Sequence, residues 1–409
     1  MQNFQKMSLS RATFMFPLAL VLFEFSVYIC NDLVQPAMLV ITQDFGVSSA
    51  WTPSSMSFFL LGGAFLSWLL GPLSDRIGRK KVLLAGVLFF VVCNLLIVFT
   101  QNIAQFLIFR LLQGIGLTIV AAVGYAAIQE IFEERDAIKV MAIMANISLI
   151  APLLGPIVGA FMIEHVSWHW GFVGIATLAA VSWFGLKLKM PDQHVVLTKR
   201  PLGGIWDDFK SVFKNPRFMG LSLTLPIVAI PLILWIALSP VILVEELGLS
   251  NMQYGLAQVP VLGALIIGNI VLIKIIDRLP LGKTVMWALP LMFIGALVLI
   301  VGVIWTDYLL WCLIIGMTIM GFAEGCSFSV LYRFALTASD VPQGTVAAAV
   351  NMILMVAFFG IIELVRILYE QYGMWSYALS CLILVALWFG FPRSIVKNIM
   401  RERLIKGES

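Results

Sequence analysis

Two acidic side chains, Glu24 and Asp32, interrupt an apolar segment that runs from about residue 14 to residue 40 and holds no other charge. A charged side chain near the centre of a bilayer costs roughly 2.5–3.5 kcal/mol on insertion scales, so such residues usually face water, a counter-charge, or a proton or ligand site. On one helix the two carboxylates are offset by about 80° and separated by about 12 Å along the axis, so both can border one cavity. They offer proton binding and attraction of a cation.

Arg110 lies within another apolar segment, at about residues 103–127. Counted at about 1.5 Å per residue from the outer ends of their segments, Asp32 and Arg110 lie about 12 Å and about 10 Å deep. If the two helices adjoin, the carboxylate and the guanidinium can form a desolvated pair, and separating them would let Asp32 bind a proton. This predicts a proton-coupled switch; the alternative is a static ion pair that only fixes packing.

A third buried acid is predicted at Glu324, in the segment 308–332, at about the depth of Glu24, roughly 24 Å. We expect Glu324 to handle protons or cations from the second half of the chain and to face Glu24 across the two halves. The alternative is a carboxylate bonded to backbone that lines an inner vestibule. Glu363 and Arg366 stand three positions apart near an outer helix end, which predicts a local ion pair.

These residues sit in a chain whose composition is that of a membrane protein, with 61% hydrophobic residues, 12% charged residues and a mean hydropathy of +1.00 over 409 residues. Windows of about 20 apolar residues predict an all-α fold of twelve transmembrane helices. The predicted spans are 14–40, 51–73, 82–99, 103–127, 139–163, 168–187, 217–243, 252–274, 283–304, 308–332, 343–366 and 374–391.

The basic residues predict the orientation of the chain, because cytoplasmic loops are enriched in Lys and Arg. If the N-terminus is inside, all of the 26 Lys and Arg except Arg110 and Arg366 fall in or beside cytoplasmic segments. Both termini are then cytoplasmic. The net charge of +4 is dispersed over several loops, which argues against nucleic-acid binding.

The longest connection, at about residues 188–216, divides the spans six and six. We expect a six-helix bundle at 1–187, a cytoplasmic linker at 188–216, a second bundle at 217–392 and a cytoplasmic tail at 393–409. Apolar residues at helical spacing predict an amphipathic helix in the linker, namely Ile205, Trp206, Phe209, Val212 and Phe213. The turn at Asp75–Lys81 has a weak echo at Asp277-Arg278 and Gly282-Lys283, so the bundles look duplicated, with a substrate site near the midplane between rocking halves.

Aromatic and thioether side chains around the acids suit the binding of unlike apolar molecules through adaptable contacts. The substrate-site candidates, besides Glu24 and Asp32, are Tyr28, Asn31, Met56, Tyr125, Met144, Trp235 and Phe358. The five cysteines lack CxxC spacing, and His165 and His169 sit among belt aromatics, so we expect no metal site. No nucleophile elbow, P-loop or paired-histidine protease motif occurs, so we expect no enzyme activity.

Three motifs resemble those of the major facilitator superfamily, and the resemblance covers the whole chain. The turn between the second and third spans reads Gly71-Pro-Leu-Ser-Asp75-Arg76-Ile-Gly78-Arg79-Lys80-Lys81, and Arg110 is followed by Gln113-Gly114. The fifth span reads Ala151-Pro-Leu-Leu-Gly155-Pro156-Ile-Val-Gly159, similar to the motif of drug/proton antiporters, although Ala151 and Ala160 stand where glycine is usual.

Two further segments narrow the resemblance to the MdfA-type multidrug/proton antiporters of Gram-negative bacteria, and within that group to a chloramphenicol-exporting member. They are Glu24-x-x-x-Tyr28-x-x-Asn31-Asp32 and Gly124-Tyr125-Ala-Ala-Ile-Gln129-Glu130. The resemblance implies a monomeric inner-membrane antiporter that exports small lipophilic drugs, driven by the proton motive force without a cofactor. It favours Tyr28, Asn31 and Met56 as pocket residues.

The resemblance also implies a conformational switch. Asp75, Arg76 and Arg79 would latch the cytoplasmic side, or would simply retain the loop inside by their charge. Gly155 permits close helix approach and Pro156 bends the helix, which in the resembling proteins seals the path against proton leak. The alternatives are a proton-coupled uptake symporter of the same fold and a membrane-embedded enzyme acting on lipids, for which no nucleophile and base stand at one depth.

Overall fold

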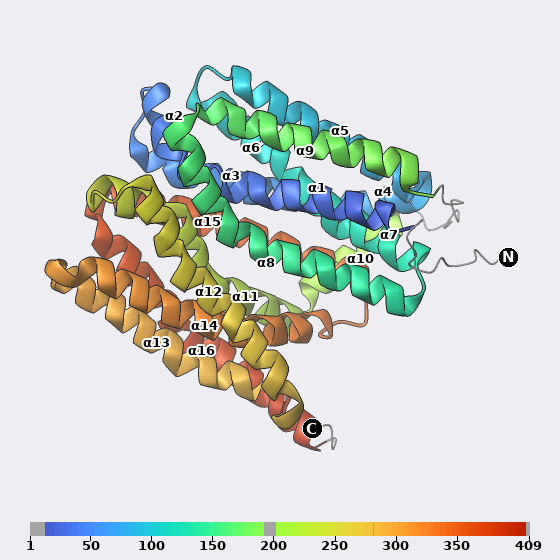
Figure 1. Cartoon of the computed structure of the whole chain (residues 1–409). Coiled ribbons are helices and arrows are strands. Elements are labelled where there is room, and N and C mark those ends of the chain that lie inside the picture. The colour runs from blue at the N-terminus through green and yellow to red at the C-terminus, as the bar shows by residue number, and fades with distance from the viewer. Residues whose placement is uncertain (1–12, 192–201, 281, 406–409) are drawn as a thin grey trace. The chain divides into compact units, whose positions relative to one another are not determined.

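The computed structural model describes residues 13–191, 202–280 and 282–405, and every regular element in them is a helix (Figure 1). Among these described residues, ten helical segments are long and apolar enough to cross a membrane. They are α1 (Met15–Asp32), α5 (Arg79–Leu96) with η2 (Ile97–Phe99), α6 (Ile103–Thr118) with η3 (Ile119–Gly124) and α7 (Tyr125–Ile131), α9 (Trp168–Lys189), α11 (Pro216–Ser239) with η4 (Pro240–Glu246), α12 (Asn251–Ile275), α13 (Lys283–Ile304), η6 (Thr306–Tyr308) with α14 (Leu309–Leu336), α15 (Gln343–Tyr372) and α16 (Met374–Ile405).

Two further apolar segments are bent or shorter. η1 (Ser49–Trp51) and α3 (Thr52–Phe65) form one arm and α4 (Ser67–Ile77) the other arm of a helix pair bent by 45°, which passes the same test as a pair. α8 (Glu134–His165) contains the apolar stretch Ile150–His165. Each predicted span overlaps one of these segments, so the predicted class, an all-α membrane protein, is confirmed.

The first predicted span, 14–40, is wrong as a single helix. α1 ends at Asp32, the chain turns through residues 33–37, and α2 (Met38–Asp44) follows. Pro36 explains the interruption, because its ring removes a backbone donor and disfavours helical geometry at the residue before it. Asp32 is therefore the last residue of a helix beside a break.

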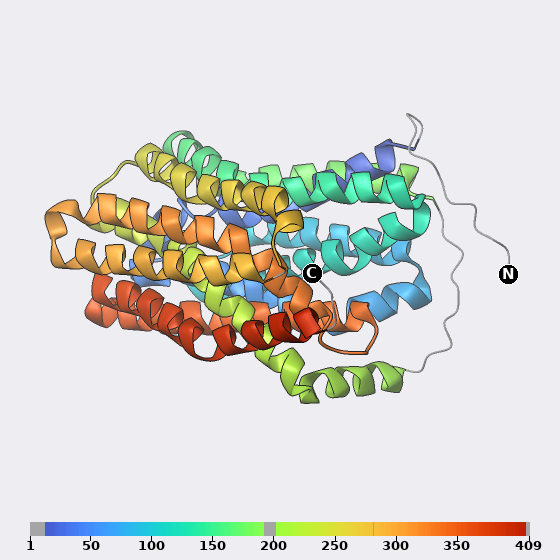
Figure 2. The same cartoon turned by 90° about the horizontal axis from the view of Figure 1, so that it is seen from below.

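Contacts divide the chain into two compact units, one of residues up to 47 and 58–206, the other of residues 48–57 and 207 onward. In the first unit α1 packs against α8 and α9, and α5 packs against α9 and α6 (Figure 1). In the second unit α14 packs against α11, α12 and α13, and α16 packs against α11 and α13; Figure 2 shows the orange pair α13 and α14 side by side.

The connection between the units contains α10 (Leu202–Lys214), with Phe209 and Val212 buried and Trp206 exposed. Residues 192–201 of the predicted linker lie outside the described residues, as do residues 1–12 of the predicted first bundle and 406–409 of the predicted tail. α16 continues past residue 392, so the segment predicted as a tail begins as helix.

Two short loops share a backbone feature. Gly78, between α4 and α5, has φ 102°, and Gly282, before α13, has φ 99°. Each glycine is followed by a basic residue that begins a helix, Arg79 or Lys283. A positive φ of this kind is accessible to glycine at little cost and strains other residues. The weak echo in the sequence therefore corresponds to a positive-φ glycine before each helix, but ψ is 136° at Gly78 and -13° at Gly282, so the two turns differ.

Candidate functional site

Glu24 is fully buried in α1 and contacts Tyr125, the first residue of α7, near the end of the fourth predicted span. The hydroxyl of Tyr125 donates a hydrogen bond to Oε1 of Glu24 at 3.1 Å. Among the described atoms, the buried Oε2 of Glu24 has no hydrogen-bond partner. An unsatisfied buried carboxylate oxygen is costly, so this position is ready to take a proton or an external donor.

Arg110 and Asp32 are brought together by Asn31. Arg110 is fully buried in α6; its Nη2 donates to Oδ1 of Asn31 at 3.3 Å, and its Nη1 donates to the carbonyl of Cys30 at 3.3 Å. Nδ2 of Asn31 in turn donates to Oδ1 of Asp32 at 3.0 Å. The guanidinium carbon of Arg110 also lies 4.6 Å from the ring centroid of Phe59. The predicted charges thus meet through an amide.

Behind Arg110 lies a second set of buried polar groups on α1, α5 and α6. Nη1 of Arg110 donates to Oε1 of Gln113 at 2.9 Å, and Nε2 of Gln113 donates to Oδ1 of Asn94 at 3.2 Å. The thiol of Cys30 lies 3.5 Å from Oδ1 of Asn94 and 3.6 Å from Oε1 of Gln113. Sequence reasoning missed Asn94; the signal was a neutral amide within an otherwise apolar helix.

The break after Asp32 rests on the glycines of α8. A methyl group added at Gly155 would come within 2.5 Å of Cβ of Asp32, and one added at Gly159 would overlap the carbonyl oxygen of Leu33. Only residues without a side chain permit this approach of two backbones. The predicted switch residues Gly155 and Pro156, both buried, therefore stand against the carboxylate-bearing end of α1.

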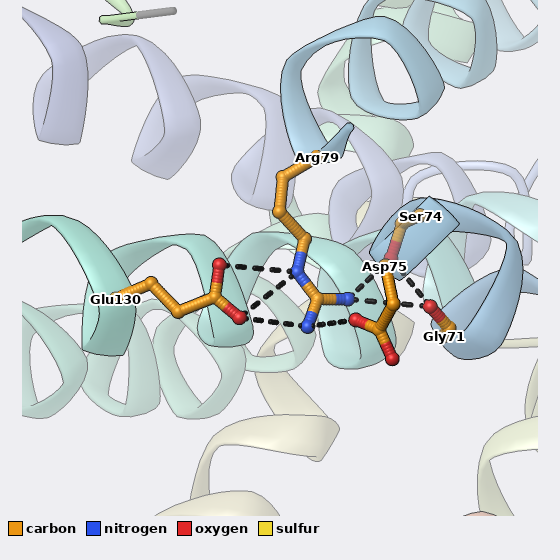
Figure 3. Close-up of polar contacts among 5 residues, drawn as sticks. All are labelled: Gly71, Ser74, Asp75, Arg79 and Glu130. Carbon is orange, nitrogen blue, oxygen red and sulfur yellow. Dashed lines mark hydrogen bonds and ion pairs between the residues drawn. The ribbon is translucent and has the colours of Figure 1, made fainter. Parts of the chain in front are cut away.

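Arg79, the first residue of α5, contacts polar groups of α4 and α7 (Figure 3). It pairs with Asp75 of α4 and with Glu130 of α7, where Nη2 and Oε1 are 2.8 Å apart. It also donates to the carbonyl of Gly71 at 3.3 Å and to the hydroxyl of Ser74. The predicted switch residues Asp75 and Arg79 are thus in contact, and Arg76 lies in the last turn of α4. Glu130 was absent from the predicted site.

In the second unit, Glu324 is buried in α14. Within the described part of the chain its carboxylate makes no hydrogen bond or ion pair, while the hydroxyl of Ser327 donates to the backbone carbonyls of Ala323 and Glu324. Trp235 of α11 is fully buried and donates through Nε1 to Oε1 of Gln258 at 2.6 Å. Nε2 of Gln258 donates to the hydroxyl of Ser239 at 3.0 Å.

The predicted pair of Glu363 and Arg366 is confirmed, with Nε and Oε2 2.8 Å apart on α15. The hydroxyl of Ser57 also donates to Glu363, and the guanidinium of Arg366 lies 4.4 Å from the ring of Trp51. These contacts place the start of α3 in the second unit. Met56, a predicted pocket residue, is buried in this segment.

The remaining pocket candidates are dispersed over three helices. Tyr28 is half-buried on α1, Met144 is fully buried on α8, and Phe358 is buried on α15. Of the predicted substrate residues, the structure joins Glu24 to Tyr125 and Asn31 to Asp32 by hydrogen bonds.

Comparison with known proteins matches residues 20–362 to the model of the Major Facilitator Superfamily. The chloramphenicol resistance protein CraA of Acinetobacter baumannii is 65% identical over 404 residues, which cover 99% of this chain and 98% of that protein. The multidrug transporter MdfA of Escherichia coli O6:H1 is 45% identical over 392 residues, 95% of each chain. The predicted resemblance to MdfA-type transporters, and within them to CraA, is confirmed.

Two solved structures share the fold. A D-xylose–proton symporter superposes with a TM-score of 0.73 at 16% identity, covering 93% of this chain and 97% of that one. A bacterial homologue of the human lysosomal transporter Spinster, inward-facing and unoccupied, superposes with a TM-score of 0.68 at 15% identity, covering 95% and 94%. At these identities the likeness concerns the fold alone.

Proposed function

The chain belongs to the major facilitator superfamily, and on this premise we propose that it is a proton-coupled multidrug efflux antiporter that exports chloramphenicol and other lipophilic neutral or cationic compounds. The observation that carries the substrate class is the 65% identity, over 99% of the chain, to a chloramphenicol resistance protein. Multidrug transporters at 43% and 45% identity support a broad spectrum. The chain is a transporter rather than an enzyme.

Asp32 is the first candidate for the exchanged proton. When ionised, Asp32 accepts the hydrogen bond from Asn31, which Arg110 orients; when protonated, it no longer carries the charge that this arrangement stabilises. Drug and proton then compete, because each favours a different arrangement of the hydrogen bonds among Asp32, Asn31 and Arg110. Glu24, with one unpartnered oxygen, is a second station for a proton or a cationic drug.

Glu324 supplies a third titratable group in the second unit. Its support is burial within an apolar helix without a described polar partner, a setting in which ionisable residues of membrane proteins usually serve transport. The pocket would draw on the aromatic, amide and thioether groups of Tyr28, Asn31, Met56, Tyr125, Met144, Trp235 and Phe358, which adapt to unlike ligands.

Alternating access would use the Arg79 cluster as a switch. In the proposed orientation, in the bacterial inner membrane with both termini cytoplasmic, Asp75, Arg76 and Arg79 face the cytoplasm. Making and breaking the contacts of Arg79 with Asp75 and Glu130 would favour one access state over the other. Gly155 and Pro156 would seal the proton path beside Asp32. Transport needs the proton motive force and no cofactor, and one chain acts as a monomer.

The test is drug-induced proton release from purified, detergent-solubilised protein on addition of chloramphenicol. Wild type should release protons, and release should disappear in whichever of Asp32→Asn, Glu24→Gln and Glu324→Gln removes the coupling acid. Asp44→Asn is the matched control, since Asp44 is an exposed acid that accepts a hydrogen bond from Trp168. Chloramphenicol binding without any release would overturn proton coupling.

A proton-coupled uptake symporter is the second candidate, because the same fold occurs in a D-xylose–proton symporter. The two differ in the sign of the linkage, since a symporter binds protons together with its substrate and an antiporter releases them. Proton uptake on addition of substrate would favour the symporter.

A further inference from the structure

Asn94 is a fully buried polar residue of α5. The exposed fraction of its side chain is zero, and every other residue of α5 from Val82 to Leu96 is apolar. Burying an amide without hydrogen-bond partners costs about 1–3 kcal/mol in proteins. The Asn94 amide therefore requires hydrogen-bond partners, and these partners indicate its role.

The orientation of the Asn94 amide is set by its own helix. Its Nδ2 donates to the backbone carbonyl of Phe90 at 2.8 Å, one turn earlier. The Oδ1 atom is thereby turned away from that carbonyl, and it accepts from Nε2 of Gln113 at 3.2 Å. Because an amide has its donor and its acceptor on opposite sides, Gln113 must then present Oε1 to the next group.

That next group is Arg110, whose guanidinium carries donors only. Nη1 of Arg110 donates to Oε1 of Gln113 at 2.9 Å, and Nη2 donates to Oδ1 of Asn31 at 3.3 Å. Nδ2 of Asn31 in turn donates a hydrogen bond to Oδ1 of Asp32 at 3.0 Å. We call this series, from the Phe90 carbonyl through Asn94, Gln113, Arg110 and Asn31 to Asp32, the amide chain. Its polarity is the same throughout on each side of the arginine.

We propose that Asn94 is a positioning residue for proton exchange at Asp32: by fixing the polarity of the amide chain, it holds the guanidinium of Arg110 on Gln113 and Asn31 rather than directly on the carboxylate. This inference rests on the proposed function. Asn94 touches neither Arg110 nor Asp32 in the described contacts; it acts through Gln113.

Loss of Asn94 should shift the balance at Asp32 in one direction. Without the Asn94 acceptor, the Gln113 amide is free to turn, and a turned amide would present donors to the donors of Arg110. The guanidinium would then move to a better acceptor, the Asp32 carboxylate. A direct ion pair favours the charged carboxylate, so proton exchange would occur at lower pH.

The surroundings of Asp32 leave Arg110 as the charged group that faces it from another helix. α1 itself carries Glu24, Tyr28 and Cys30, and Gly155 of α8 lies against its Cβ. On α8 and α9, the charged and histidine side chains that the structure describes lie within the first six or the last three residues of each helix. They are Arg135, Asp136, Lys139, Glu164, His165, His169, Lys187 and Lys189. The segment η3 has no titratable residue.

The test measures chloramphenicol-induced proton release from purified full-length protein over a range of pH, with chloramphenicol affinity measured at alkaline pH, where Asp32 is ionised in every variant. In Asn94→Leu the pH midpoint of release should fall by about one unit or more, and in Asn94→Ser by less, since a hydroxyl can still bond the Phe90 carbonyl. Affinity at alkaline pH should stay within about twofold of wild type.

Ser182→Ala is the matched control. It removes another fully buried hydrogen bond of the first unit, from the Ser182 hydroxyl to the carbonyl of Ala19 on α1 at 2.7 Å, without touching the amide chain. Its pH midpoint should equal that of wild type. A shift in Ser182→Ala as large as that in Asn94→Leu would mean that general loosening moves the midpoint, and would overturn the inference.

A double-variant cycle tests the route. Gln113→Leu should shift the midpoint by itself, and Asn94→Leu should add nothing in that background, because both break the same chain. Additive shifts would overturn action through Gln113. If Asn94→Leu fails to fold, Asn94→Ser decides: an unchanged midpoint overturns the inference. If wild type itself releases no protons, the proposed function fails and this inference fails with it.

Discussion

The loop before α5 and the loop before α13 both contain a glycine of positive φ, but ψ is 136° at Gly78 and -13° at Gly282, and the chemistry around the two loops differs. Gly78 and Gly282 have φ values of 102° and 99°, and each precedes a basic residue that begins a helix. Arg79 then binds Asp75 and Glu130, whereas Nζ of Lys283 lies 5.6 Å from the ring centroid of Trp287. The two loops share a positive-φ glycine before a basic residue, while the ion cluster belongs to the loop of the first unit.

The difference teaches that a repeated glycine followed by a basic residue does not imply a repeated role. A lysine over an aromatic ring is a weak, locally satisfied contact, whereas an arginine shared by carboxylates of two helices couples the positions of those helices. The first loop should therefore affect turnover, and the second should affect stability only through its glycine.

The largest effect should come from Arg79→Gln, which removes both ion pairs and the bond to the Gly71 carbonyl. Hydrogen bonds that involve a charged group contribute about 1.5–3 kcal/mol each. Chloramphenicol transport into everted vesicles should fall about tenfold or more, while chloramphenicol binding to purified protein is retained. Lys80→Gln, which changes the neighbouring basic residue, is the control. Equal loss of binding and transport would argue against a conformational role.

Gly78→Ala and Gly282→Ala should each destabilise the protein, since both glycines have a positive φ. The left-handed conformation of Gly282 costs a residue with a Cβ about 1–2 kcal/mol, and the conformation of Gly78, with ψ 136°, is essentially restricted to glycine and costs about 1–3 kcal/mol. At Gly282 the added methyl would also meet the flexible side chain of Met400 at 3.0 Å. Thermal unfolding monitored in detergent should show a loss at both positions, at least as large for Gly78→Ala as for Gly282→Ala. Gly174→Ala, in open space on α9, is the control and should not lose stability. A loss at only one loop would break the structural half of the comparison.

Asp75→Asn should reduce turnover by about threefold, because Arg79 keeps Glu130 as a partner and Asp75 is itself 42% exposed, which weakens the pair. Glu130→Gln should give a similar partial loss. Transport and binding are measured as for Arg79→Gln, with Asp307→Asn on the 3-10 turn η6 as the control. A loss in Asp75→Asn larger than that in Arg79→Gln would show that Asp75 has a partner more important than Arg79.

The smallest effect should come from Lys283→Gln, since an exposed cation–π contact contributes about 0.5–1 kcal/mol. Transport should stay within about twofold of wild type, measured beside Arg79→Gln in the same vesicles. A loss comparable to that of Arg79→Gln would show that the second loop is also a switch, and the asymmetry proposed above would be wrong.

The sequence was sufficient to predict the helical class because membrane-spanning segments must be long, apolar and internally hydrogen-bonded. It was insufficient where one residue outweighs a window average, as at Pro36, which ends α1 near Asp32 within an unbroken apolar run. It also could not show that Ser57 and Trp51 contact Glu363 and Arg366, because those partners are remote in the chain.

For the candidate site, charge in an apolar segment was a sufficient signal for Glu24, Asp32 and Arg110, and the structure links the last two through Asn31. Asn94 gave a weaker signal, since a neutral amide changes hydropathy little and its partner lies on another helix. The roles assigned to these residues, including Glu324, remain predictions that the proton-release experiments test.

The close contact of Gly155 and Gly159 with the end of α1, at Asp32 and Leu33, affects how such a transporter can acquire new substrates. Side chains that line a pocket can be exchanged one at a time, so the range of exported compounds can drift under antibiotic selection. No side chain can be added at Gly155 without displacing Asp32. A saturation-mutagenesis library selected on chloramphenicol should therefore tolerate many substitutions at Tyr28 or Met144 and almost none at these two glycines: we expect specificity to evolve while the position of Asp32, the proposed coupling acid, stays fixed.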